Sequence, residues 1–376
     1  MKKELQIISF NYPYPPSYGG LIDVYYKIKA LSELGVTIHL HCFVENIPAV
    51  IDEEVASLVD NIFFYRKKRN PLLFLFKDPF SVKIRTSKIL LQNVVKIDAP
   101  VLFEGLQTTG IAKYLKHKSI FLRLHNNEEA YYKGLSQSEE NFVKKIVYYF
   151  ESYKYRFYQK SKFALFETVF CLSQKEYNEV NSNTGNASLI GIFHGNTHVK
   201  ILEGRGEYFL FHGDLSISDN RKALYSVIEV FEKLPQYNLV VASDKATPKI
   251  KQNLSKHQNI KLVPIENQDN LNLLLSHAQA NILLSYQKSG TKVKLFNTLF
   301  NSRFTIINDN ITDDPQLINL CTLINDKTEL RDKIIEIATQ DFKMYSQKQI
   351  VLENNYSDLN LAKRMADIIF KDQAGQ

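Results

Sequence analysis

The sequence predicts an α/β fold with two doubly wound parallel sheets, and three observations support this. Strand-like apolar runs alternate with runs of helical periodicity along most of the chain, which is typical of βαβ units. A polar, glycine-containing stretch, residues 194–206, interrupts the alternation as a linker would. The alternation then restarts at Tyr208. At 376 residues, the chain is also long enough for two domains.

The first half is expected to form one sheet with its helices. Its strands are predicted near residues 5–10, 36–43, 61–65, 100–103, 119–124, 169–172 and 188–193. A helix is predicted at 21–34, because apolar residues recur at helical spacing there and Gly35 follows as a stop.

The second half repeats this pattern. Its strands are predicted near residues 208–211, 237–242, 260–263, 280–285 and 304–308. A helix is expected from Asp219, as its N-cap, to Leu234, and the tail from 327 to 371 is expected to be helical without a further strand. These elements predict an N-terminal domain at 1–200, a C-terminal domain at 201–345 and a terminal helix at 346–376 that packs back toward the first domain.

Composition indicates a globular protein of a reducing compartment. Hydrophobic residues make up 44% of the chain and charged residues 23%. The three cysteines are far apart in apolar runs, as expected of buried thiols rather than of disulfides or a zinc site. The N-terminus lacks the pattern of a signal peptide, and no apolar run approaches the ~18 residues of a membrane span. We therefore expect a cytoplasmic protein.

The net charge of +7 is concentrated in residues 65–88, which carry eight Lys and Arg residues against Asp78 alone. This segment also contains the apolar run 72–76. Apolar side chains flanked by cations are typical of an interfacial anchor on an anionic membrane. The alternative is a core element with solvated basic flanks. The segment thus gives a candidate peripheral contact with the inner face of the membrane.

A second basic and aromatic stretch, residues 141–162, is expected to form either a largely buried helix or a lipid contact, because aromatic residues recur on nearly every face. Similar chemistry could bind nucleic acid. No recognition motif accompanies it, so no nucleic-acid partner is expected.

The loop from Asn11 to Gly20 joins the first strand to the first helix. Gly19 and Gly20 have no Cβ and could admit a positive φ or a ligand close to the backbone. The free N–H groups of the helix start could bind an anion. The loop matches neither the dinucleotide fingerprint nor the phosphate loop, and a simple turn with a glycine helix entry remains the alternative.

The order of these pieces resembles the GT-B glycosyltransferases, specifically glycosyltransferase family 4, also called group 1. The resemblance covers most of the chain. It rests on motifs in both halves: Pro13-Tyr-Pro-Pro-Ser-Tyr-Gly-Gly20, Ala30-Leu-Ser-Glu-Leu-Gly-Val36, Phe121-Leu-Arg-Leu-His-Asn-Asn-Glu128, Val169-Phe-Cys-Leu-Ser-Gln174, Phe211-His-Gly-Asp-Leu215 and Ser289-Gly-Thr-Lys-Val-Lys-Leu295. It implies two Rossmann-like domains facing an interdomain cleft, with C-terminal helices.

The resemblance also implies site residues. The catalytic residues it implies are His125, beside the transferring sugar, and Lys294, at the diphosphate. The donor-binding residues it implies are Gly19, Gly20, Gly213, Ser289, Gly290, Thr291 and Lys294. As a lone histidine among neutral neighbours, His125 could instead cap its own loop. The segment 289–295 could instead be a helix cap with surface lysines.

Four positions depart from the family pattern. Asp214 and Asp219 stand where many members have an arginine and a lysine for the diphosphate. Arg221 or Lys222 could replace these cations or point into solvent. The usual pair of glutamates is also absent, since it would fall near Ser289 and Asn297.

The function that this resemblance implies is a retaining glycosyltransferase. It would transfer a hexose from a nucleotide diphosphate sugar to a surface-glycan or lipid-linked saccharide acceptor. No metal is expected, because no D-x-D-like carboxylate pair follows a strand, and no cofactor other than the donor sugar is expected. Glu104 and Glu128 are candidate acceptor-side carboxylates or structural residues. The alternatives are a non-catalytic homologue that binds a glycan or partner subunit, and a nucleotide-sugar epimerase of the same architecture.

Overall fold

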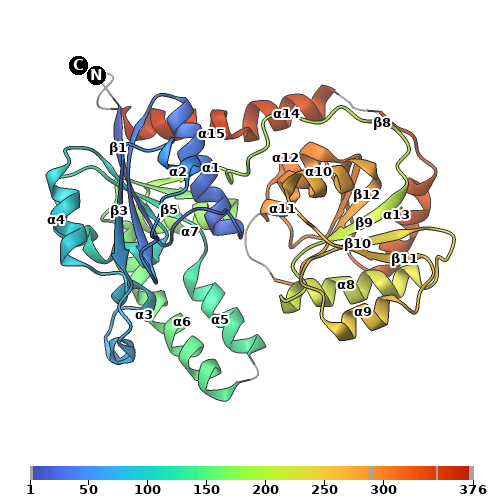
Figure 1. Cartoon of the computed structure of the whole chain (residues 1–376), viewed down its shortest axis with the longest axis horizontal. Coiled ribbons are helices and arrows are strands. Elements are labelled where there is room, and N and C mark those ends of the chain that lie inside the picture. The colour runs from blue at the N-terminus through green and yellow to red at the C-terminus, as the bar shows by residue number, and fades with distance from the viewer. Residues whose placement is uncertain (1–2, 140, 288–291, 344–345, 372–376) are drawn as a thin grey trace. The chain divides into compact units, whose positions relative to one another are not determined.

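The computed structural model describes residues 3–139, 141–287, 292–343 and 346–371. The chain forms two compact units, residues 1–195 with 358–376 and residues 196–357 (Figure 1). The chain therefore passes between the units twice, after Gly195 and before Asp358.

The first unit contains a sheet of seven strands, all paired in parallel. Their order is β3-β2-β1-β4-β5-β6-β7. The bounds are β1 Glu4–Ser9, β2 Thr37–Val44, β3 Asn61–Arg66, β4 Val101–Glu104, β5 Ile120–Leu124, β6 Thr168–Cys171 and β7 Ala187–Leu189. In the centre of the sheet, Ile7 of β1 pairs with Leu40 on one side and Leu102 on the other. The strand order reverses between β1 and β4, as in a doubly wound sheet.

Helices cover this sheet. The bounds are α1 Gly19–Glu33, α2 Glu53–Ala56, η1 Pro71–Leu75, α3 Phe80–Lys83, α4 Lys88–Lys96, η2 Leu106–Tyr114, α5 Glu128–Ser138, α6 Phe142–Phe163, α7 Gln174–Thr184 and α15 Asp358–Ile369. Helix α1 buries Leu21, Val24, Ile28 and Leu31, whose spacing places them on one face. The last helix, α15, packs beside α1 and shares its core (Figure 1).

The second unit has a parallel sheet of six strands in the order β11-β10-β9-β12-β13-β14. The bounds are β9 Tyr208–His212, β10 Leu239–Ala242, β11 Ile260–Val263, β12 Ala278–Leu283, β13 Phe304–Ile307 and β14 Thr322–Leu323. Its helices are α8 Ser218–Phe231, α9 Pro248–Leu254, α10 Gln268–His277, α11 Val293–Asn301, α12 Pro315–Ile318, α13 Lys327–Ala338 and α14 Ser346–Tyr356. The predicted α/β class with two doubly wound sheets is confirmed.

Two predictions about strands are wrong. The tail does contain a strand, β15 at Phe342–Lys343, which pairs antiparallel with β8 at Glu203–Gly204 inside the predicted linker. The seventh strand ends at Leu189 instead of 193. Beyond it, the carbonyls of Ile190 and Gly191 accept hydrogen bonds from a buried arginine instead of a neighbouring strand.

The apolar run of the basic segment 65–88 does not form a core element, although Tyr65 and Val82 of the same segment are buried in the core. The run lies in η1 and the residue after it, and Leu72, Leu75 and Phe76 are all more than half exposed. Among the described residues, no helix has both the length and the hydrophobicity to cross a membrane. The cysteines are free thiols, of which Cys42 and Cys171 are buried and Cys321 is partly buried.

Candidate functional site

The first unit has its candidate site where the strand order reverses. In open α/β sheets, ligands bind beyond the carboxyl ends of the strands at such a switch point. The glycine loop follows β1, and Glu104 is the last residue of the adjacent β4. His125 follows directly after the next strand, β5. The sequence-predicted Glu104 and His125 therefore lie at neighbouring strand ends, and Gly20 begins the helix that follows β1.

Gly19 and Gly20 lie in the first turn of α1, whose N-cap is Tyr18. Neither has a positive φ, so these glycines do not use the left-handed conformation that was open to them. Close packing explains the glycine at position 20 instead. An added Cβ would lie 3.1 Å from Phe10 Cζ and 3.4 Å from Tyr18 Cε2. The ring of Phe10 in turn packs edge-on against His125, with 5.3 Å between ring centroids.

Five buried titratable side chains form a network at this position: Asp23, Lys27, Glu104, Arg123 and His125. Arg123 donates to Asp23 through Nη2 (2.7 Å to Oδ1) and Nε (3.1 Å to Oδ2), a bidentate pair. Lys27 Nζ donates to Asp23 Oδ2 at 2.8 Å and to Glu104 Oε2 at 2.9 Å. Two carboxylates are thus balanced by two cations, which is what makes their burial tolerable.

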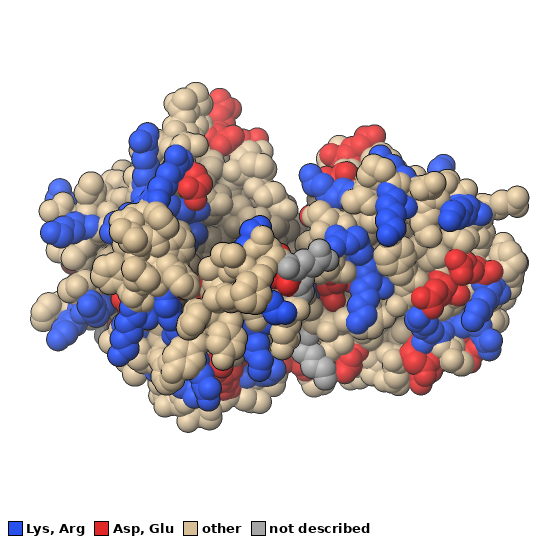
Figure 2. Space-filling model, turned by 90° about the horizontal axis from the view of Figure 1, so that it is seen from below, with Lys and Arg blue, Asp and Glu red and all other residues tan. Residues whose placement is uncertain are grey.

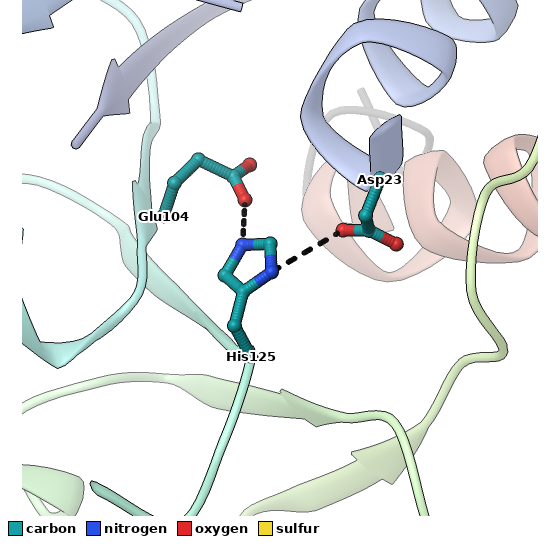
Figure 3. A group of neighbouring side chains, drawn as sticks. All are labelled: Asp23, Glu104 and His125. Atoms are coloured by element: carbon teal, nitrogen blue, oxygen red, sulfur yellow. Dashed lines mark hydrogen bonds and ion pairs between the residues drawn. The ribbon is translucent and has the colours of Figure 1, made fainter. Parts of the chain in front are cut away.

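His125 completes the network. The sequence suggested a lone histidine among neutral neighbours, but the structure places it between two carboxylates. Its Nε2 lies 2.8 Å from Glu104 Oε2, and its Nδ1 lies 3.9 Å from Asp23 Oδ2 (Figure 3). Figure 3 shows the imidazole between the two carboxylates. Nε2 is thus within hydrogen-bond distance of Glu104, whereas Nδ1 is too far from Asp23 for a hydrogen bond. Glu104 therefore orients the ring and favours one of its tautomers.

The charges in the network outweigh the effect of burial on both acids. Burial alone would raise the pKa of Asp23, but Arg123 and Lys27 hold that pKa well below its usual range. Burial likewise opposes ionisation of Glu104, and Lys27 and His125 lower its pKa nonetheless. Both carboxylates are therefore ionised at neutral pH.

Asp23, Glu104 and His125 each bring one ligand atom within 4.8 Å of the others, which is close enough to hold a metal ion. The Lys27 ammonium, however, already contacts the same Asp23 and Glu104 oxygens. A metal ion would have to displace this buried ammonium. The arrangement therefore favours an ion-pair network over a metal centre.

Glu128 begins α5 and is 6% exposed. Burial raises its pKa to about 8, with Arg85 acting in the opposite direction and Glu176 in the same one. Arg85 itself donates to the backbone carbonyls of Phe10 and Ser81. Glu128 thus differs from Glu104: it is a protonatable acid near the end of β5 and not a partner in the ion-pair network.

Glu128→Gln is expected to stabilise the protein above pH 8. Between pH values of about 4.5 and about 8, Glu128 keeps its proton in the folded protein but loses it in the unfolded chain. The Glu128 side chain therefore lowers the free energy of unfolding as the pH rises through this range. The gain should be on the order of 1–3 kcal/mol above the folded pKa and should vanish in acid. Thermal unfolding across this pH range measures it, with Glu129→Gln at the neighbouring, partly exposed position as control. Parallel pH profiles for both variants and the wild type would contradict the prediction.

The second unit has its switch point between β9 and β12. His212 ends β9 and is 4% exposed, and neither ring nitrogen has a hydrogen-bond partner among the described residues. Burial and the nearby Lys294 charge lower its pKa to about 3, so the ring is neutral. The next residue, Gly213, allows the start of α8 to pack closely, since an added Cβ would lie 3.3 Å from the Asn220 side chain.

Asp219 is not the N-cap of α8, so that prediction is wrong. The helix begins at Ser218, one residue earlier, after Ile217. Asp219 Oδ2 accepts from Ser285 Oγ at 2.7 Å and Oδ1 from Tyr286 N at 2.8 Å. The carboxylate therefore fastens the first turn of α8 to the segment that follows β12.

Lys294 lies in the first turn of α11 and is partly buried. Its Nζ is 3.5 Å from Asn220 Oδ1, a long contact. Burial and the charge of Lys292 lower the pKa of Lys294 to about 8, while Asp219 acts in the opposite direction. The structure thus brings Lys294 close to the ends of β9 and α8. Ser289, Gly290 and Thr291 lie outside the described residues.

The two cations considered as replacements for the family pair are both engaged. Arg221 Nη1 donates to the carbonyls of Leu215 and Ser216. Lys222 Nζ lies 4.3 Å from the ring centroid of Tyr286. Both cations therefore have other partners, whereas Lys294, among the described residues, makes only a long 3.5 Å contact with Asn220.

Three members of the buried network were missed by sequence reasoning: Asp23, Lys27 and Arg123. A signal existed for each. Asp23 and Lys27 are charged residues four apart within the apolar pattern of the first predicted helix. Arg123 interrupts the apolar run of the fifth predicted strand. A charge at a core position requires a buried partner.

Two parallel α/β units, each with a reversal of strand order, define a protein of the GT-B fold, and comparison with solved structures confirms this fold. WaaG, a glycosyltransferase involved in lipopolysaccharide biosynthesis, is 13% identical, with a TM-score of 0.58 over 97% of this chain and 99% of that one. HepE of Anabaena, solved with UDP and glucose, is 10% identical, with a TM-score of 0.62 over 100% of both chains. The UDP-GlcNAc 2-epimerase of Neisseria meningitidis, bound to UDP-GlcNAc, is 13% identical, with a TM-score of 0.57 over 99% and 100%.

In sequence, the chain is similar to an uncharacterized 44.6 kDa protein in the cps region of Klebsiella pneumoniae. The two are 24% identical over 324 residues, which cover 80% of this chain and 81% of that protein. No protein-family model matches the chain.

Proposed function

We propose that the protein is a glycosyltransferase that uses a nucleotide diphosphate sugar as its donor. The observation that carries this proposal is the end of β9 in the second unit. A buried, neutral His212 without a hydrogen-bond partner among the described residues lies near a weakly bonded Lys294 cation there. A cation near a buried polar side chain that lacks a hydrogen-bond partner among the described residues, at a switch point, is suited to a phosphate ligand. The GT-B fold and the glycosyltransferase and UDP-bound structures that share it support the same ligand class.

In this proposal, Lys294 stabilises the charge that builds on the diphosphate as the glycosidic bond breaks. The backbone around Gly213 and at 289–291 would bind the donor with it. Gly19, Gly20 and His125 would contribute from the first unit, with Glu104 orienting His125. Transfer would retain the anomeric configuration, since the leaving phosphate can take the acceptor proton on the same face. No metal or cofactor would then be required.

The acceptor would be a surface glycan or a lipid-linked saccharide, and the transferred sugar a hexose. The relative from a cps region and WaaG, which is involved in lipopolysaccharide biosynthesis, support this acceptor class. The reaction would then take place at the cytoplasmic face of the membrane, with residues 65–88 as a candidate contact. A lipid-linked acceptor explains why a chain without a membrane-spanning helix among its described residues would expose the apolar run at 72–76.

A non-catalytic homologue that binds a glycan or a partner subunit is the second candidate. Asp214 and Asp219 favour it, because both place a negative charge where many family members bind the diphosphate with cations. An epimerase is a third candidate, since one such enzyme shares the fold.

Calorimetric titration of the whole protein with UDP, GDP, CDP and ADP tests the proposal. We expect one of the four to bind with a dissociation constant in the micromolar range, about −8 kcal/mol. UDP is tested first because HepE was solved with it. If no nucleotide binds, the transferase proposal fails and the non-catalytic candidate is favoured. If UDP-GlcNAc is converted without an acceptor, the epimerase is favoured.

A further inference from the structure

The long helix α6 exposes an apolar face. Seven of its apolar side chains are between 40% and 74% exposed: Phe142, Val143, Ile146, Tyr149, Phe150, Tyr153 and Phe157. At about 100° per residue, they fall within an arc of roughly 120°. The opposite face carries Tyr155, Tyr158 and Phe163, which are buried in the core of the first unit. The sequence analysis gave a buried helix and a lipid contact as alternatives for this stretch. In the structure, one face of the helix is buried and the other is exposed. We refer to the seven exposed side chains as the α6 stripe.

The charge of α6 is almost entirely positive. The helix carries six cations: Lys144, Lys145, Lys154, Arg156, Lys160 and Lys162. Its one acid, Glu151, is buried and accepts hydrogen bonds from Phe80 N and Lys154. At about 100° per residue, Lys145 and Arg156 flank one edge of the stripe and Lys154 the other. Figure 2 shows that blue Lys and Arg side chains outnumber red acidic ones on this view of the first unit.

The exposed apolar residues of η1 adjoin the same helix. Lys154 Nζ donates to the carbonyl of Phe74 and lies 4.0 Å from the centroid of its ring. These contacts fix η1 against the Lys154 edge of the stripe. Leu72 and Leu75 of η1 are 63% and 80% exposed. The exposed residues of η1, within the basic segment 65–88, and the α6 stripe are therefore parts of one surface.

We propose that the α6 stripe and η1 form one docking surface for an anionic lipid bilayer. The apolar side chains enter the boundary between head groups and acyl chains, and Lys145 and Arg156 at one edge of the stripe contact anionic head groups. A second copy of the chain is disfavoured as the occupant, because it would bring like charges together around the stripe. This proposal rests on the proposed function, in which residues 65–88 were the candidate membrane contact. It adds α6 to that contact and assigns the main apolar contribution to the α6 stripe.

The chain contains no tryptophan, so a single introduced tryptophan reports on one position. Tyr149→Trp lies in the stripe, and Tyr114→Trp, at a position outside it, has a similar exposure (63% against 58%). With phosphatidylcholine vesicles that contain about one-third phosphatidylglycerol, we expect a blue shift of the fluorescence for Tyr149→Trp only. No shift for Tyr149→Trp, or equal shifts at both positions, would overturn the proposal.

Vesicle co-sedimentation measures the energetic contribution of the surface. Lys145→Glu with Arg156→Glu should weaken binding to the anionic vesicles by at least about 25-fold, since each lost cation accounts for about fivefold. Phe142→Ser with Phe157→Ser should weaken it by at least tenfold. The control is Leu273→Ser with Ile335→Ser, two exposed apolar residues of the second unit, which should bind like the wild type.

Three outcomes of these measurements would overturn the proposal: equal binding to pure phosphatidylcholine, unchanged binding of both α6 variants, or a dimer in sedimentation that Phe142→Ser with Phe157→Ser abolishes. The last would identify a second copy as the occupant. Nucleotide titration of the same variants keeps the two proposals separate. The α6 variants should bind nucleotide like the wild type, so loss of vesicle binding alone leaves the transferase proposal intact.

Discussion

Replacing Asp23 by alanine is expected to lower the free energy of unfolding by about 3–5 kcal/mol. Asp23 accepts from Arg123, from Lys27 and from the backbone N–H of Phe193, at 2.7–3.1 Å. Its loss leaves Lys27 with Glu104 as its carboxylate partner and leaves Arg123 without a carboxylate partner in the network. Because a whole domain is stable by only about 5–15 kcal/mol, this variant should be close to unfolding.

Urea denaturation of Asp23→Ala against Asp98→Ala provides the matched comparison. Asp98 is fully exposed and lies 3.8 Å from Lys118, so its replacement should leave stability almost unchanged. The double variant Asp23→Ala with Arg123→Met should recover part of the loss, since it also removes one unpaired cation. If Asp23→Ala and Asp98→Ala unfold at the same urea concentration, the buried network does not stabilise the first unit.

The fold was predictable because hydrophobic periodicity is a local property of the sequence. The strand at Leu5 to Phe10 and the helix face of Leu21, Val24 and Ile28 are readable from a few neighbouring residues, and the structure confirms both with small shifts at their ends. The two-residue strands β8 and β15 were missed for the same reason. They are too short for any periodicity, and each is defined by a partner more than a hundred residues away.

The sites were less predictable because their contacts are not local. Asp23 and Arg123 are a hundred residues apart, so the sequence shows two misplaced charges but not that they pair. Asp219 has the local features of a helix cap, but its carboxylate instead accepts hydrogen bonds from Ser285 and Tyr286, which are distant in sequence. His125 was found from a motif, whereas its two carboxylate neighbours come from other elements (Figure 3).

Lys294→Ala is expected to have the largest effect on activity. It should weaken nucleotide diphosphate binding by about 10–100-fold and lower turnover by roughly 10²–10³-fold, the range for removing one charge-stabilising group. Folding should be little affected, because Lys294 makes only a 3.5 Å contact with Asn220 and its charge is disfavoured by burial. Titration calorimetry, turnover with the matching nucleotide sugar and thermal unfolding measure these three quantities. Lys251→Ala, on α9 of the same unit, controls for the loss of a surface charge.

The pH dependence of nucleotide affinity shows whether the Lys294 ammonium binds the phosphate or the residue is only structural. Its pKa of about 8 means that the free protein loses this cation as pH rises through 8. If the cation binds the diphosphate, wild-type affinity should fall above pH 8, by up to about tenfold per pH unit. Lys294→Arg should keep its affinity there, because guanidinium stays charged, and Lys294→Ala should show no such dependence. His212 cannot produce the same profile, since its pKa is near 3. Nucleotide binding with the same affinity and pH profile in all three proteins would place the phosphate away from Lys294, while leaving the transferase proposal standing.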